Sequence, residues 1–132
     1  MSKSLQGIVI AFFFFILWII YSADTGKSNV FFDIVSIIPN GDKLGHFFLF
    51  GILALLINFA LRFKSITIWQ KLPLGTVLVS VFVILEELSQ GFLPNCTIDI
   101  ADLIADGLGV FIFTLIGYLL FENKELDLKK AN

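Results

Sequence analysis

The chain has 132 residues, 58% of them hydrophobic and 15% charged, and its mean hydropathy of +0.94 is too high for a water-soluble domain. A formal net charge of -2 offers no basic surface to a nucleic-acid partner, and a single cysteine excludes an internal disulfide and a multi-cysteine metal site. A lipid bilayer is therefore the expected solvent, and the length allows one domain, residues 1–132.

Four segments are apolar over about 20 residues, the length that a helix needs to cross about 30 Å of hydrocarbon. They cover residues 5–23, 44–61, 72–92 and 100–121. The sequence therefore predicts an all-α integral membrane protein, built as a bundle of four transmembrane helices. The first segment follows Lys3 as a signal peptide would, but Tyr21 stands where a cleavage site needs a small residue, which favours an uncleaved anchor.

A short amphipathic stretch separates the first two segments. Its hydrophobic residues recur at helical spacing among polar ones and are Val30, Phe31, Ile34, Val35 and Ile38. Because the stretch is too short to cross a bilayer, we expect a short interfacial helix between spans 1 and 2. Pro39, Asn40 and Gly41 then interrupt the chain before the second span.

The basic residues predict the orientation, because they are retained on the cytoplasmic side of a membrane. With four spans, only Lys27 and Lys43 fall on one side. The other side carries Lys3, Arg62, Lys64, Lys71, Lys124, Lys129 and Lys130. We therefore expect both termini in the cytoplasm.

Polar residues gather at the outer ends of the second, third and fourth predicted spans. Their spacing places each set on one helix face. The sets are Asp42 with His46, Glu87 with Gln90, and Asp99 with Asp102 and Asp106. Glu86 is adjacent to Glu87 and cannot share its face. Because Glu87 is aligned with Gln90, Glu87 is the favoured site residue. An ionised group at membrane depth is costly unless it is paired or hydrated, so we expect these faces to converge on an outward-opening pocket.

The expected pocket is strongly acidic. So many carboxylates cannot all remain charged in a poorly hydrated space, so either some keep protons or a cation sits among them. Oxygen-rich ligands with one imidazole suit a divalent cation, with Asp102 and Asp106 as tentative metal ligands. In an enzyme, His46 or Glu87 would be the catalytic base. The expected binding residues are Asp42, Lys43, Gln90 and Asp99.

Several of these residues have simpler interpretations. Asp42 and Asp99 equally suit helix caps, and His46 equally suits an interhelical hydrogen bond. Lys43 suits contact with interfacial phosphates or with an anionic headgroup. Five glycines are expected to permit close contact between helices: Gly45, Gly51, Gly107, Gly109 and Gly117.

The same residues stand in an order that resembles the VanZ-like family of small bacterial membrane proteins. The resemblance runs from Asp42 to Gly117. Its matching positions are Asp42, Lys43, His46, Glu87, Gln90, Phe92, Pro94, Asp102 and Gly109. The chain departs from the family pattern at Cys96, where arginine is common, and at Asp106, where asparagine is common. Both departures make the pocket more negative and weaken the case for a phosphate clamp.

The resemblance implies a single VanZ-like transmembrane domain in the bacterial cytoplasmic (inner) membrane. The family takes its name from a protein associated with teicoplanin resistance, which implies a cell-envelope setting. We therefore expect binding or modification of a membrane lipid or lipid-linked cell-wall component. Two alternatives remain open: a cation- or proton-coupled transporter component, and a non-catalytic accessory subunit with a membrane-protein partner. Transport is the weaker alternative because no ionisable residue continues through the inner half of the spans.

Overall fold

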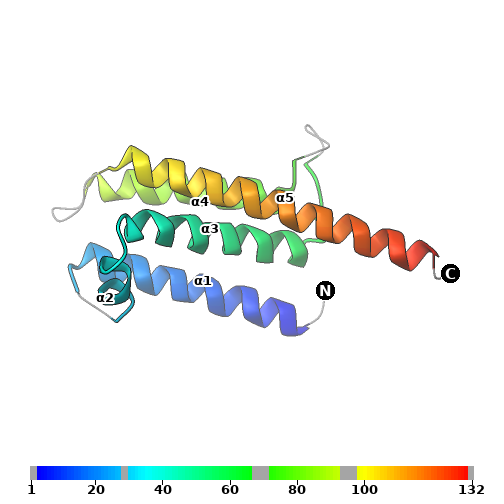
Figure 1. The fold of residues 1–132 in the computed structure, drawn as a ribbon, viewed down its shortest axis with the longest axis horizontal. Helices are drawn as coiled ribbons and strands as arrows, with labels where there is room; N and C mark the ends of the chain where they lie inside the picture. The colour runs from blue at the N-terminus through cyan, green and yellow to red at the C-terminus, as the bar shows by residue number, and fades with distance from the viewer. Residues whose placement is uncertain (1–2, 28–29, 67–71, 93–97, 131–132) are drawn as a thin grey trace.

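The computed structural model describes residues 3–27, 30–66, 72–92 and 98–130, and within these ranges it contains five α-helices (Figure 1). They are α1 (Lys3–Asp24), α2 (Val30–Ser36), α3 (Gly41–Ala60), α4 (Leu74–Gln90) and α5 (Ile100–Lys130). No β-strand occurs in the described ranges. The predicted all-α class is therefore confirmed.

Within the described ranges, three helices are long and apolar enough to cross a membrane: α1, α3, and α5 over Ile100–Lys124. The length and composition of these helices support the predicted membrane protein. The helix α4 has 17 residues, which at about 1.5 Å per residue reach about 25 Å, a little less than the hydrocarbon thickness. A fourth span, and an interfacial position for α2, stay predictions.

The four long helices run side by side, and α2 lies at the left-hand end, beside α1 and the start of α3 (Figure 1). The central helix is α3, which packs against each of the other four and most extensively against α5. At the left-hand end of Figure 1, α1 and α4 end while α3 and α5 begin. This antiparallel order brings the polar residues of α3, α4 and α5 to the same end of the bundle.

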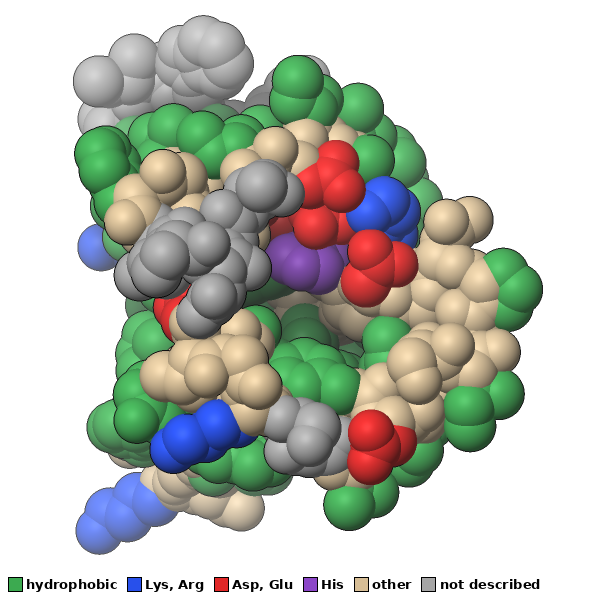
Figure 2. Space-filling model, turned by 90° about the vertical axis from the view of Figure 1, so that its left-hand side faces the viewer, with side chains coloured by type: hydrophobic (Ala, Val, Ile, Leu, Met, Phe, Trp, Pro, Cys, Tyr) green, Lys and Arg blue, Asp and Glu red, His purple; other side chains and the backbone are tan. Residues whose placement is uncertain are grey.

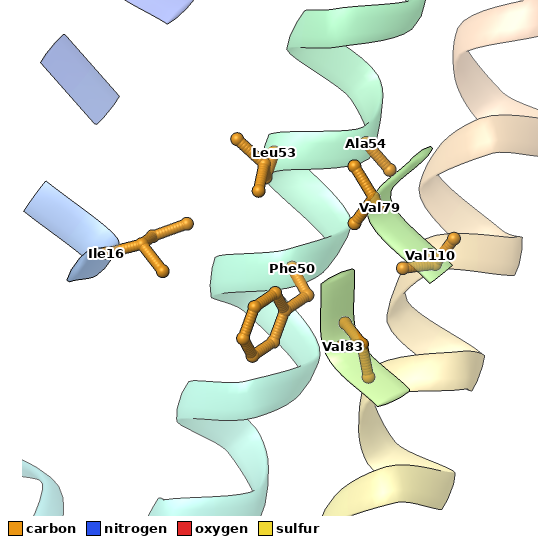
Figure 3. Packing of buried hydrophobic residues seen from close by; sticks show 7 residues of the cluster. All are labelled: Ile16, Phe50, Leu53, Ala54, Val79, Val83 and Val110. Atoms are coloured by element: carbon orange, nitrogen blue, oxygen red, sulfur yellow. The ribbon is translucent and has the colours of Figure 1, made fainter. Parts of the chain in front are cut away.

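Interlocked side chains from all four long helices form the core (Figure 3). The core residues are Ile16 of α1, Phe50, Leu53 and Ala54 of α3, Val79 and Val83 of α4, and Val110 of α5. In a bilayer, lipid tails are as apolar as these side chains, so close packing and interhelical hydrogen bonds hold such helices together. The core is centred on α3, which supplies three of these residues and packs against every other helix.

Small residues let α3 and α5 approach closely. A Cβ atom at Gly51 would lie 2.6 Å from the Phe113 ring, and one at Gly109 would collide with the carbonyl oxygen of Phe47. A Cβ atom at Gly117 would likewise meet the side chains of Leu55 in α3 and Phe63 just after α3. The predicted role in close contact is therefore confirmed for these three glycines.

The same prediction is wrong for Gly45 and Gly107. A Cβ atom at either position would meet nothing within 4 Å. Both glycines border open space between helices, and the number of small residues in a sequence does not show which of them will meet a neighbouring helix. Gly45 in particular lines a cavity that is described below.

A buried polar network links α3, α4 and α5 at a distance from the charged end. Asn58 has no exposed surface, and its Nδ2 donates to the Thr76 hydroxyl at 2.8 Å. The backbone N–H of Thr76 donates to Asn58 Oδ1 at 3.1 Å, and the Thr76 and Thr114 hydroxyls lie 2.9 Å apart. Bonds of this kind contribute roughly 0.6 kcal/mol each in membrane proteins. They fix α4 against α3 and α5.

Replacing Gly109 with alanine should weaken the contact between α3 and α5, because the added methyl group meets the Phe47 carbonyl. Overpacking of this kind costs about 1–3 kcal/mol of unfolding free energy. Gly107→Ala is the matched control, since its methyl group enters open space and alanine favours a helix. Unfolding by SDS in mixed micelles measures both variants. Equal stability of the two would contradict the close contact at Gly109.

Candidate functional site

Lys43, in the first turn of α3, lies among three carboxylates at the charged end of the bundle. Its Nζ atom is 2.9 Å from a carboxylate oxygen of each of Asp42, Asp99 and Asp102. An ammonium group has three hydrogens, so these contacts use its full donor capacity. Two of the partners precede or begin α5, and the ammonium therefore ties the start of α5 to the start of α3. Figure 2 shows this charged group from the end of the molecule.

Asp99 both caps the N-terminus of α5 and pairs with Lys43. Its Oδ1 accepts a hydrogen bond from the backbone N–H of Ala101 at 2.8 Å, so the predicted cap of the α5 N-terminus is confirmed. Its Oδ2 accepts from Lys43. The Lys43 ammonium, with help from the Ala101 N–H, holds the pKa of the Asp99 carboxyl below its ordinary value of 3.8.

One helical turn further along α3, His46 meets a buried carboxylate of α5. The imidazole Nδ1 lies 3.1 Å from Oδ1 of Asp106, which has no exposed surface. The interhelical hydrogen bond expected as one alternative is thus present. With Nδ1 donating to Asp106, Nε2 carries the free lone pair. That atom is 3.9 Å from Asp102 Oδ2, too far for a hydrogen bond.

The end of α4 contributes two buried acids. Glu86 is 7% exposed and Glu87 is 2% exposed. Gln90 Nε2 donates to Glu86 Oε1 at 2.6 Å, and the Asp99 N–H donates to Glu87 Oε1 at 2.5 Å. Each acid keeps a buried Oε2 atom for which the described residues supply no hydrogen-bond partner.

Gln90 bonds Glu86, whereas the sequence spacing had aligned Gln90 with Glu87. Residues four apart on a helix lie almost directly above one another, and this places the Gln90 amide over Glu86. Glu87 instead anchors the start of α5 through the Asp99 backbone. The i, i+4 spacing was the sequence signal that could have identified Glu86.

A cavity of about 220 Å³ lies beside these groups, where the surface in Figure 2 is hollowed next to the histidine. Its polar wall consists of Asp42, His46, Glu86 and Gln90. Its apolar walls come from three helices and include Ile16 and Ile19 of α1, Phe31 and Phe32 of α2, and Leu49 and Phe50 of α3. The cavity is therefore amphipathic, with charged groups on one side and hydrocarbon on the others.

The structure distributes the predicted site residues over three neighbouring places. Asp42, His46 and Gln90 line the cavity, Asp106 lies behind His46, and the Lys43 group holds Asp99 and Asp102. Glu87 is buried near this group, between α4 and the start of α5. Sequence reasoning missed the contribution of α1 and α2 to the cavity, because apolar residues give no sign of which helices meet. Cys96 and Pro94 lie outside the described residues.

The tentative metal ligands Asp102 and Asp106 are bonded to Lys43 and His46. Over residues 3–27, 30–66, 72–92 and 98–130, no group of three or more His, Cys, Asp and Glu side chains has an arrangement that could hold a metal ion. The Lys43 ammonium occupies the position among the carboxylates where a cation was expected. A divalent cation at this end of the molecule stays a prediction.

Comparison with known proteins adds no relative. No protein-family model, curated protein or solved structure matches the chain. The chemistry of the site is therefore argued from its own residues.

Asp99→Asn should reduce the loss of stability that acid causes. Because the pKa of Asp99 is lowered in the folded protein, its bond to Lys43 contributes stability that is fully present above pH 3.8 and is lost as the pH falls through the lowered value. The SDS unfolding midpoint, measured across this range, should therefore fall more steeply for the wild-type protein than for Asp99→Asn. Asp33→Asn, which removes an exposed carboxylate of α2, is the control and should follow the wild type. Identical curves for all three proteins would refute the pairing.

Proposed function

We propose that the chain is a VanZ-like, four-span protein of the bacterial cytoplasmic membrane that binds, at its outer end, the polar head of a lipid or lipid-linked cell-wall component. The observation that carries this proposal is the amphipathic cavity, in which His46 and Glu86 face hydrocarbon side chains of α1, α2 and α3. A ligand that satisfies both kinds of wall must itself be amphipathic.

The packing of α4 supports a fourth span. It lies against both α3 and α5, and its Thr76 bonds Asn58 within the bundle. A helix so placed runs through the same depth as its neighbours. The excess of basic residues in the predicted inner segments then supports an orientation with both termini in the cytoplasm and the cavity at the outer surface. In this arrangement α2 lies at the interface and closes the cavity with Phe31 and Phe32.

The size of the cavity indicates how such a ligand would sit. Pockets that enclose a whole drug-sized molecule hold about 300–1,000 Å³, and this cavity holds about 220 Å³. It accommodates the junction between a polar head and one acyl chain, while the remaining ligand stays in the surrounding bilayer. The exposed hydrophobic surface of α1, including Phe14 at 64% exposure, is consistent with lipid contact nearby.

The pair formed by His46 and Asp106 favours a catalytic version of this function. A buried carboxylate that holds Nδ1 orients the imidazole and stabilises its protonated form, so Nε2 can accept a proton from a hydroxyl group or a water molecule. Both cavity binding and proton transfer then use the same residue, because His46 lines the cavity. An enzyme of this kind would act on the bound headgroup.

Cysteine labelling in intact cells tests the four-span arrangement. In a Cys96→Ser background, Phe92→Cys should react with an impermeant maleimide from outside, because Phe92 follows α4 and is 89% exposed. Lys64→Cys, which precedes α4 and is also exposed, should react only after the membrane is permeabilised. Labelling of both positions from the same side would show that α4 does not cross.

Photolabelling tests the lipid site. The protein is placed in nanodiscs that contain a phospholipid with a photoactivatable acyl chain, and the labelled residues are mapped by mass spectrometry. We expect labelling of the cavity walls at Ile19 and Phe32, and a several-fold loss of this labelling in Gly45→Leu, whose side chain would enter the cavity. Gly107→Leu also enters open space, but away from this cavity, and is the matched control. Unchanged labelling in Gly45→Leu would exclude the cavity as the lipid site.

A further inference from the structure

Among the buried side-chain atoms of the described residues, the hydrogen bonds at the charged end leave one without a partner on a residue that lines the cavity, and this atom is Glu86 Oε2. Lys43 serves three carboxylates, and His46 serves Asp106. Glu86 Oε1 receives the Gln90 amide, whereas Glu86 Oε2 has no partner among the described residues. Since Glu86 lines the cavity and Glu87 does not, Glu86 is the buried acid that a ligand in the cavity would meet.

Burial makes this vacant acceptor significant. Glu86 is 93% buried, so little water reaches its carboxylate. A buried polar atom without a hydrogen bond costs about 1–3 kcal/mol, and a charged one more. A ligand that brings a hydrogen-bond donor to Oε2 would remove this cost, and its binding free energy would be more favourable for that reason.

The surrounding charges make an anionic head less favourable than a cationic one. Lys43 contacts three carboxylates, and His46, the one basic residue among the described residues that line the cavity, bonds Asp106. No cation in the described part of the cavity wall is left to hold a phosphate or carboxylate. A cationic donor, by contrast, would both bond Glu86 and reduce the negative charge contributed by Asp42.

We infer that the ligand of this cavity is an amphiphile whose head is a protonated amine held by Glu86 and whose aliphatic chain lies against the apolar walls. The inference rests on the proposed function, since it assumes that the cavity takes a lipid-like molecule. Phe50 adds an aromatic ring to the cavity wall. An ammonium group over the face of such a ring is attracted to it by a cation–π interaction. A trimethylammonium head has the same charge but no N–H group, so it cannot bond Glu86 Oε2.

Four probes with the same alkyl chain test the head chemistry on the wild-type protein. Dodecylamine, dodecyltrimethylammonium, dodecanol and dodecanoate are compared at equal mole fraction in phosphatidylcholine nanodiscs, each competing with the photoactivatable phospholipid. We expect dodecylamine to displace the label at about tenfold lower concentration than any other probe. Ethanolamine, which has the amine without the chain, should displace little.

Variants then assign the preference to Glu86. Glu86→Gln should abolish the tenfold advantage of dodecylamine and leave displacement by dodecanol unchanged, while Glu86→Asp, which keeps a carboxylate, should retain part of the advantage. Asp33→Asn removes the same charge from the exposed face of α2 and should behave as the wild type. The SDS unfolding midpoint establishes that each variant is folded.

The outcomes separate the two proposals. Equal displacement by dodecylamine, dodecyltrimethylammonium and dodecanol would overturn the amine head and leave the lipid site intact. Displacement by ethanolamine as strong as that by dodecylamine would replace the amphiphile with a free amine. If no alkyl probe competes and Gly45→Leu labels as the wild type does, the proposed lipid site itself fails.

Discussion

The contact of one ammonium group with three carboxylates holds the charged end of this molecule together. Without Lys43, the acids at the start of α3 and α5 would repel one another at short range. With it, the start of α5 is tied to the start of α3, and the glycines Gly51 and Gly109 allow the two helices to continue in close contact. The pairing of His46 with Asp106 one turn further along depends on this register.

The same requirement, that each polar group in a membrane finds a partner, divides the remaining polar residues into two kinds. Asn58 and its threonine partners satisfy one another and join three helices. Glu86 is only half satisfied, and its free oxygen belongs to the residue that lines the amphipathic cavity. The closed hydrogen bonds of Asn58 indicate a structural role, whereas the unsatisfied oxygen of Glu86 together with its place in the cavity wall supports the proposed binding site.

Much of the helical framework could be predicted from hydropathy, because backbone groups in lipid must bond within their own helix. The predicted segment 44–61 matches α3, Gly41–Ala60, and the segment 100–121 lies within α5. The predicted segment 72–92 extends two residues beyond each end of α4, which begins after Pro73 and ends at Gln90. The gathering of polar residues at one end followed from alternation of direction between successive helices (Figure 1).

Composition and spacing by themselves predicted a membrane as the solvent, and they indicated the helices and the end at which the charges collect, because these follow from the cost of placing polar groups in hydrocarbon. Only the tertiary structure decided that Gln90 bonds Glu86, that Gly45 borders empty space while Gly109 touches α3, and that α1 and α2 wall the cavity. Those outcomes depend on the rotation of each helix about its axis and on separations of a few ångströms. A linear pattern of residue types specifies a face but not the neighbour that meets it.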